Sequence, residues 1–217
     1  MALLDLLFPP RCGGCGAIGK QWCPSCAASI QSIEAAKLDG VPLIAAGRLA
    51  GPLQRAIHTY KYGHRPQLAA ELSRPLVEAI LKSGMPVPAL TFVPLHPRRQ
   101  RERGFNQAQW LANELGRRLG VPVIGGLGRV RTTPAQVGLS QAERRVNLIG
   151  AFAWRGPGMA PQGLVLVDDV CTTGATLEAA AAAIRQAGGS IGAFAVLARA
   201  QALPAPAVTL PEQSARS

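Results

Sequence analysis

The segment Leu164 to Leu177, LVLVDDVCTTGATL, restricts the fold of this chain more than any other. Its first four residues are apolar and predict a buried strand. The alanine-rich stretch 175–187, closed by two glycines, predicts a helix that starts directly after a short turn. Strands and helices alternate in the same way through most of the chain. We therefore expect an α/β fold, in which a parallel sheet is covered by helices on both faces.

The other elements of this sheet are predicted from apolar periodicity and from glycine and proline positions. Helices are expected at 52–63, at 65–84 with a break at Pro75, and at 105–120, where Trp110, Leu111, Leu115 and Leu119 share one face. Strands are expected at 42–51, 89–97, 121–124, 151–154 and 191–200, a short helix or linker at 27–38, and a polar, basic loop at 128–150.

Four of the five cysteines lie close together near the N-terminus, in C-x2-C-x7-C-x2-C spacing. Each C-x2-C pair can turn two thiolates toward one point, and four thiolates at about 2.3 Å form a closed tetrahedral zinc site. A segment this short cannot bury a core, so metal binding would supply its folding energy. Disulfides or a redox pair are the alternatives. We expect structural Zn2+ on Cys12, Cys15, Cys23 and Cys26, covered by Trp22.

The turn after the predicted strand at 164–167 combines two acids with several hydroxyl groups. A helix N-terminus offers unpaired amides and positive dipole charge, to which Thr172, Thr173 and Thr176 add hydroxyl groups. Gly174 lets the backbone approach a ligand closely. These groups suit a phosphate, whereas Asp168 and Asp169 suit the vicinal hydroxyls of a sugar. A ribose 5-phosphate satisfies both; the alternative is an ordinary strand followed by a capped helix.

Composition restricts the partners of the chain. Its 217 residues carry a net charge of +11, which favours polyanionic partners such as nucleic acid, although a basic surface also serves solubility. Aromatic residues make up 5% of the chain, which argues against an extensive base-stacking surface. No apolar run reaches the roughly 20 residues of a membrane span, and the N-terminal segment does not match a secretion signal. We expect a cytoplasmic protein without membrane insertion.

The turn resembles the phosphoribosyl-pyrophosphate (PRPP) motif of type I phosphoribosyltransferases: four apolar residues, two acids, two apolar residues and Thr-Thr-Gly-Ala-Thr. Cys171 departs from it, because larger apolar residues are common there. The resemblance implies that Asp168 and Asp169 bind the ribose hydroxyls, and that Thr172, Thr173, Gly174, Ala175 and Thr176 bind the 5′-phosphate. It also implies Mg2+, bound mostly through ligand oxygens and water.

Two arginine-rich segments match the pyrophosphate and catalytic loops of those enzymes. In the first, Arg98, Arg99, Arg101 and Arg103 precede Gly104, and in the second, Arg131, Arg144 and Arg145 accompany Gln136 and Asn147. The planar guanidinium group binds phosphate in a bidentate manner. A solvated basic face is the alternative for both segments. Lys61, in the sequence HTYKYG, can either reach a phosphate or lie on a solvated helix face.

Taken together, these motifs resemble the ComF family of competence proteins, up to about Ala200. The resemblance rests on the cysteine quartet, HTYKYG, VPLHPRRQRERGFNQA, TPAQVGLSQAERRVNLIGAF and LVLVDDVCTTGATL. It implies a zinc-ribbon-like segment (1–35), a type I phosphoribosyltransferase-like domain (40–200) and a disordered tail (201–217). It also implies single-stranded DNA and a helicase-like competence protein as partners.

Three functions are compatible with these motifs. The first is a DNA-uptake protein whose transferase-like domain binds PRPP. The second is an active phosphoribosyltransferase, although no acceptor-binding segment is evident and the catalytic residues stay unknown. The third is a PRPP sensor without turnover, acting on a protein partner. DNA handling follows mainly from the resemblance, with the net charge as weaker support.

Overall fold

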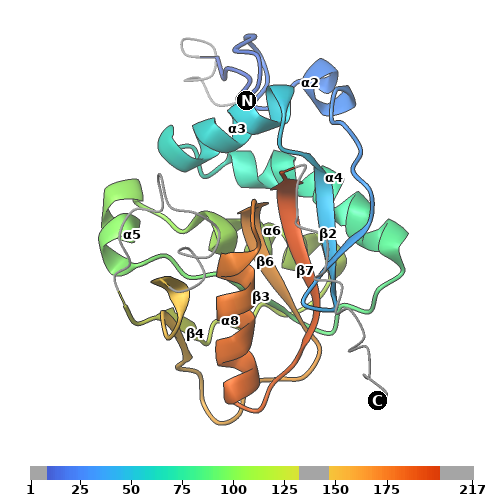
Figure 1. Ribbon diagram of the computed structural model, residues 1–217. Helices are drawn as coiled ribbons and strands as arrows, with labels where there is room; N and C mark the ends of the chain where they lie inside the picture. Colours follow the sequence, from blue (N-terminus) through green and yellow to red (C-terminus); the bar gives the residue numbers. More distant parts are fainter. Residues whose placement is uncertain (1–8, 132–146, 201–217) are drawn as a thin grey trace, which may run out of the picture.

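The centre of the fold is a five-stranded sheet in the order β1-β2-β7-β6-β3 (Figure 1). The computed structural model describes residues 9–131 and 147–200. Strands β2, β7, β6 and β3 run parallel, and β1 is antiparallel to β2. A separate antiparallel pair consists of β4 and β5. The strands are β1 Ala36–Leu38, β2 Val41–Arg48, β3 Leu90–Phe92, β4 Leu127–Arg129, β5 Phe152–Trp154, β6 Leu164–Cys171 and β7 Ile191–Arg199.

Helices cover both faces of this sheet. On one face, side chains of α3, α4 and α6 form a core with alternate residues of β6 and β7. On the other, α8 and the β4–β5 pair form a second core with the remaining residues of these strands. The expected α/β fold with a parallel sheet is thus confirmed. The helices are α2 Pro24–Ala28, α3 Gly51–Tyr62, α4 Leu68–Ser83, α5 Pro97–Arg103, α6 Gln107–Leu119 and α8 Ala175–Gln186.

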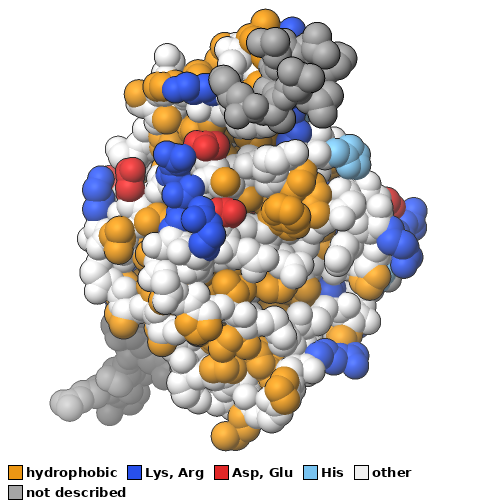
Figure 2. Space-filling view, turned by 180° about the vertical axis from the view of Figure 1, so that it is seen from behind, with side chains coloured by type: hydrophobic (Ala, Val, Ile, Leu, Met, Phe, Trp, Pro, Cys, Tyr) orange, Lys and Arg blue, Asp and Glu red, His pale blue; other side chains and the backbone are white. Residues whose placement is uncertain are grey.

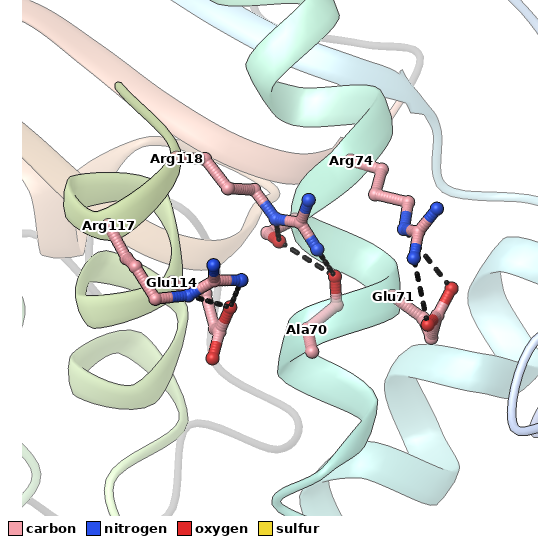
Figure 3. Close-up of polar contacts among 7 residues, drawn as sticks. Ala70, Glu71, Arg74, Glu114, Arg117 and Arg118 are labelled. Carbon is pink, nitrogen blue, oxygen red and sulfur yellow. Dashed lines mark hydrogen bonds and ion pairs between the residues drawn. The ribbon is translucent and has the colours of Figure 1, made fainter. Parts of the chain in front are cut away.

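Polar contacts join α4 and α6 on the outside of the first core (Figure 3). The Arg118 side chain donates to the Ser73 hydroxyl at 3.0 Å and to the Ala70 carbonyl at 2.8 Å. Arg117 pairs with Glu114 on its own helix. On the face seen from behind, basic and acidic side chains lie side by side (Figure 2). Among the described residues on this face, the basic side chains do not form one continuous patch. The net positive charge is therefore not concentrated on this face.

The N-terminal segment that contains the cysteine quartet packs directly on α3 and α4. Cys12, Trp22 and Cys26 belong to the same buried cluster as the inner faces of these helices. Arg55 of α3 donates to the Gly14 carbonyl at 2.6 Å, and Thr59 donates to the Gly13 carbonyl at 3.1 Å. The segment is therefore fixed to the helix whose last turn faces the sheet edge described below.

Several local predictions differ from the structure. Helix α4 is not split at Pro75, because Leu72, Leu76 and Ile80 are fully buried. That burial is worth ~1.5–3 kcal/mol per side chain, against a proline cost of ~3 kcal/mol. Trp110 does not share the buried face of α6; its side chain is 44% exposed and packs edge-on against Phe105. Segment 121–124 forms only an isolated bridge from Val123 to Leu90.

The segment 27–38 contains the end of α2, extended residues and the strand β1. Among the described residues, no helix has the length and apolar character that a membrane span requires. The expected tail at 201–217 lies outside the described residues, as does segment 132–146 with Gln136, Arg144 and Arg145.

Candidate functional site

Asp168 and Asp169 lie near the carboxyl end of β6, where ligands of parallel sheets bind. The strand extends to Cys171, further than its apolar residues alone predict. Asp169 is buried and Asp168 is half-buried. The Asp169 amide donates to the Asp168 Oδ1 atom at 2.8 Å. Neither acid lies free in solvent, so each requires a compensating group.

The compensating group for Asp169 is Lys61, in the last turn of α3. Its Nζ atom lies 2.8 Å from Asp169 Oδ1, and the side chains are 21% and 11% exposed. Burial alone would lower the pKa of Lys61, but the charge and hydrogen bond of Asp169 raise it above its usual value. Lys61 therefore belongs to the acid pair, and neither of the two sequence interpretations of this lysine anticipated this contact.

The carboxyl group of Asp168 has a raised pKa. Burial, followed by the neighbouring charge of Asp169, raises the pKa of Asp168 to about 7. The charges of Lys61 and Arg129 oppose this shift only in part. A carboxyl group whose charge is this costly in the free protein is one that a ligand with hydroxyl donors or a cation can stabilise.

This shift predicts how stability depends on pH. Because the folded protein holds the proton of Asp168 up to about pH 7, this group makes folding less favourable as pH rises from about 4, the unfolded value, to 7. We expect Asp168→Asn, which keeps an oxygen for the Asp169 amide, to be more stable than the wild type at pH 8 and little changed at pH 4. Denaturant unfolding at both pH values measures the difference, and a pH-independent difference would contradict the assignment.

The threonine-rich turn follows the acids and leads into α8. Thr172 is exposed and Thr173 is half-buried, and the Thr173 Oγ1 atom accepts from the Ala175 amide at 3.5 Å. Gly174 precedes the helix with a φ of +84°, and a Cβ atom at this position would collide with the Leu38 side chain. The requirement for glycine is therefore both conformational and steric. The structure brings these hydroxyl groups and the first amides of α8 to the end of the strand that carries the acids.

The arginine-rich segment 97–103 forms the short helix α5, whereas a loop was expected. The His96 side chain accepts from the Arg98 amide, and Gly104 ends the helix with a φ of +78°. Arg98 is exposed and forms an ion pair with Glu102 at 3.0 Å, one turn further along the same helix.

Arg103, unlike Arg98, contacts residues of α3 and α6. It donates to Gln107 Oε1 at 3.1 Å and to the Tyr62 hydroxyl at 3.3 Å, with its guanidinium 4.9 Å from the centre of the Tyr62 ring. Its charge acts on Lys61, the adjacent residue in α3. Arg103 is thus placed beside Lys61, the partner of Asp169.

Arg129 of β4 also acts on Asp168. Burial and the charge of Arg99 lower the pKa of Arg129, and the charge of Asp168 opposes this. Arg129 is therefore close enough to Asp168 to influence it, and Arg99 acts on Arg129. The sequence motifs do not single out Arg129. Arg131 is exposed and donates to the Ile149 carbonyl at 2.8 Å.

The four N-terminal cysteines form one cluster, whose sulfur atoms all lie within 4.8 Å of one another. The Sγ atoms of Cys15 and Cys23 are 3.7 Å apart, close to the edge of about 3.8 Å of a sulfur tetrahedron with bonds of about 2.3 Å. Burial alone would raise the pKa of Cys12, but amides of Cys15, Cys23 and Gly14 lower it to about 6. The cluster therefore fits structural Zn2+, with Trp22 buried beside it as expected.

Sequence comparisons support the assignment of the cysteine cluster and show which proteins the chain resembles. Residues 3–37 match the family model described as "Double zinc ribbon domain". The chain is 32% identical over 187 residues to "Competence protein F" of Haemophilus influenzae, which covers 82% of this chain and 80% of that protein. It is 38% identical over 143 residues to "DNA utilization protein YhgH" of Salmonella typhi, and the match spans only 62% of each chain.

Among solved structures, the chain is similar to an adenine phosphoribosyltransferase from Thermoanaerobacter pseudethanolicus. The identity is 15%, the TM-score is 0.40, and the match covers 81% of this chain and 86% of that one. The α/β assignment itself rests on the strand order and on the helices that cover both faces of the sheet.

Proposed function

Since the chain belongs to the ComF family of competence proteins, we propose that it acts in DNA uptake through a PRPP-binding site at the carboxyl edge of its sheet. One observation carries this proposal: an acid pair and a threonine-rich helix start occupy the same strand-to-helix turn. The acids accept hydrogen bonds from the ribose 2′- and 3′-hydroxyls. The threonines and the first amides of α8 hold the 5′-phosphate.

The neighbouring cations suit the pyrophosphate group of the same ligand. Lys61, Arg103 and Arg99 come from α3 and α5, and each influences the acid pair or a group beside it. Arg103 is already oriented by Gln107 and Tyr62, so little side-chain entropy is lost when it contacts a phosphate. Gly104 gives the chain its turn at this edge. Mg2+ would neutralise pyrophosphate and enter mainly through ligand oxygens and water.

Catalysis and sensing differ in the fate of this ligand. In the transferase, an acceptor nucleophile bonds to C1′ of the ribose while the C1′–oxygen bond breaks and pyrophosphate leaves. In the sensor, PRPP binds and stays intact.

An assay of pyrophosphate release separates the two. The full chain is incubated with Mg2+, PRPP and either nucleobases or single-stranded DNA. Pyrophosphate release that depends on an acceptor supports an enzyme, and stoichiometric binding without release supports a sensor.

Single-stranded DNA is the macromolecular partner that we propose, with a helicase-like competence protein beside it in the cytoplasm. The relatives named for competence and DNA utilization support this role, and the net charge of +11 is compatible with it. We expect the affinity for single-stranded DNA to fall by about 10-fold or more between 50 and 200 mM salt, because bound phosphates release counterions. Fluorescence anisotropy measures this; a salt-independent affinity, or none at 50 mM salt, would contradict direct DNA contact.

A further inference from the structure

Lys61 is held in its position before any ligand arrives. Its own carbonyl accepts from Gln107 Nε2 at 3.4 Å, and the preceding residue, Tyr60, donates its hydroxyl to the Gln107 carbonyl at 2.8 Å. Two residues before Lys61, the Thr59 hydroxyl donates to the Gly13 carbonyl of the cysteine-rich segment. The last turn of α3 is therefore fixed on both sides, and its lysine is directed at Asp169.

The buried position of the Lys61 ammonium group costs desolvation free energy, which suggests that the group has a function in the site. A lysine at a helix end usually keeps its charge in water, and the next residue, Tyr62, is 56% exposed. Lys61 instead pairs at 2.8 Å with a buried acid, which requires desolvation of both charges. An uncharged pair of side chains would satisfy packing at lower cost, so packing alone does not explain the pair.

The charges show what the lysine changes. Two adjacent carboxylates are hard oxygen ligands of the kind that bind divalent cations, and together they repel a pyrophosphate. One oxygen of Asp168 accepts from the Asp169 amide, and one oxygen of Asp169 accepts from Lys61. The ammonium thus compensates the charge of Asp169 and contacts one of the two oxygens that this carboxylate could offer to a metal ion.

We propose that Lys61 is a built-in counter-ion of the acid pair, which prevents a free divalent cation from occupying Asp169 before the sugar phosphate binds. The proposal rests on the proposed PRPP site and specifies the order in which its ligands bind. The metal ion binds only together with the pyrophosphate ligand. Lys61 is a positioning residue that acts through Asp169, and its charge also reduces the repulsion of the incoming ligand.

Mn2+, observed by electron paramagnetic resonance, tests this with the full-length protein and no PRPP. We expect Lys61→Met to bind Mn2+ at least ~10-fold more tightly than the wild type, since an opposing charge beside the acids is removed. The same variant should bind PRPP with Mg2+ at least ~10-fold more weakly. Lys61→Arg should restore both properties to near wild-type values, and Lys61→Met combined with Asp169→Asn should lose the gained Mn2+ affinity.

Lys82→Met is the matched control, because Lys82 is an exposed lysine in the last turn of α4. It should leave both affinities unchanged. The inference is overturned if folded Lys61→Met, or Lys61→Gln where the methionine variant does not fold, binds Mn2+ no better than the wild type. Stoichiometric Mn2+ binding by the wild type at micromolar concentration also overturns it. Absence of PRPP binding by the wild type is a separate result, which refutes the proposed function itself.

Discussion

Replacing Asp168 and Asp169 together by asparagine should reduce the affinity for PRPP at least ~100-fold, because each lost charged acceptor is worth ~1.5–3 kcal/mol. The change keeps the size of both side chains and leaves an oxygen at position 168 for the Asp169 amide. The fold should therefore persist, as judged by circular dichroism and thermal unfolding. Isothermal titration with PRPP and Mg2+ gives the affinity.

Asp39→Asn is the matched control for this variant. Asp39 is exposed, and its carboxylate pairs with Arg185 at the C-terminal end of α8, at the opposite end of that helix from the threonine-rich turn. It should bind PRPP as the wild type does. If the folded double variant retained wild-type affinity, the acids would not bind the sugar, and the assignment of this turn would be wrong.

The second large effect concerns the cysteine cluster. Cys23→Ser should release the metal and lower the free energy of unfolding by several kcal/mol, on the order of 3 or more, because zinc binding contributes directly to folding of such segments. Cys23 is only half-buried, so its replacement leaves no large cavity and mainly reports loss of the ligand. Since Cys12, Trp22 and Cys26 share the core of α3 and α4, the loss should extend beyond the segment itself. Zinc content by mass spectrometry and denaturant unfolding provide the two measurements.

Cys171→Ser is the control for this effect, since Cys171 lies in the other core, under α8. It should lower stability modestly and retain one zinc ion per chain. Stoichiometric, tightly bound zinc in Cys23→Ser would exclude the four-thiolate site. Equal zinc loss in both variants would indicate general unfolding.

Local patterns in the sequence predict much of this molecule. The strand at 164–167, the helix that follows it and the cysteine quartet are each encoded within a few residues, by apolar runs, a glycine or a fixed spacing. The structure accordingly places Asp168, Asp169 and the threonine-rich turn together at one sheet edge, and the four cysteines in one cluster.

Contacts between residues that are far apart in the sequence cannot be predicted from such local patterns. Lys61 and Asp169 are far apart in the chain and meet only because the fold brings the last turn of α3 to the carboxyl end of the sheet. Arg129 lies in the basic segment 128–150, but nothing local in that segment indicates that it acts on Asp168, an effect that depends on the position of the β4–β5 pair. Pro75 was expected to split its helix, but the burial of its neighbours compensates for the proline. In each case tertiary packing determines the outcome.

The central claim is that an acid pair and a threonine-rich helix start form one site for PRPP. The most direct test is isothermal titration of the zinc-loaded wild-type chain with PRPP, with and without Mg2+, with inorganic phosphate as the competing ligand. We predict one site per chain with micromolar affinity, strengthened by Mg2+ and little affected by phosphate at equal concentration. No heat of binding at millimolar PRPP with Mg2+ present would contradict the account.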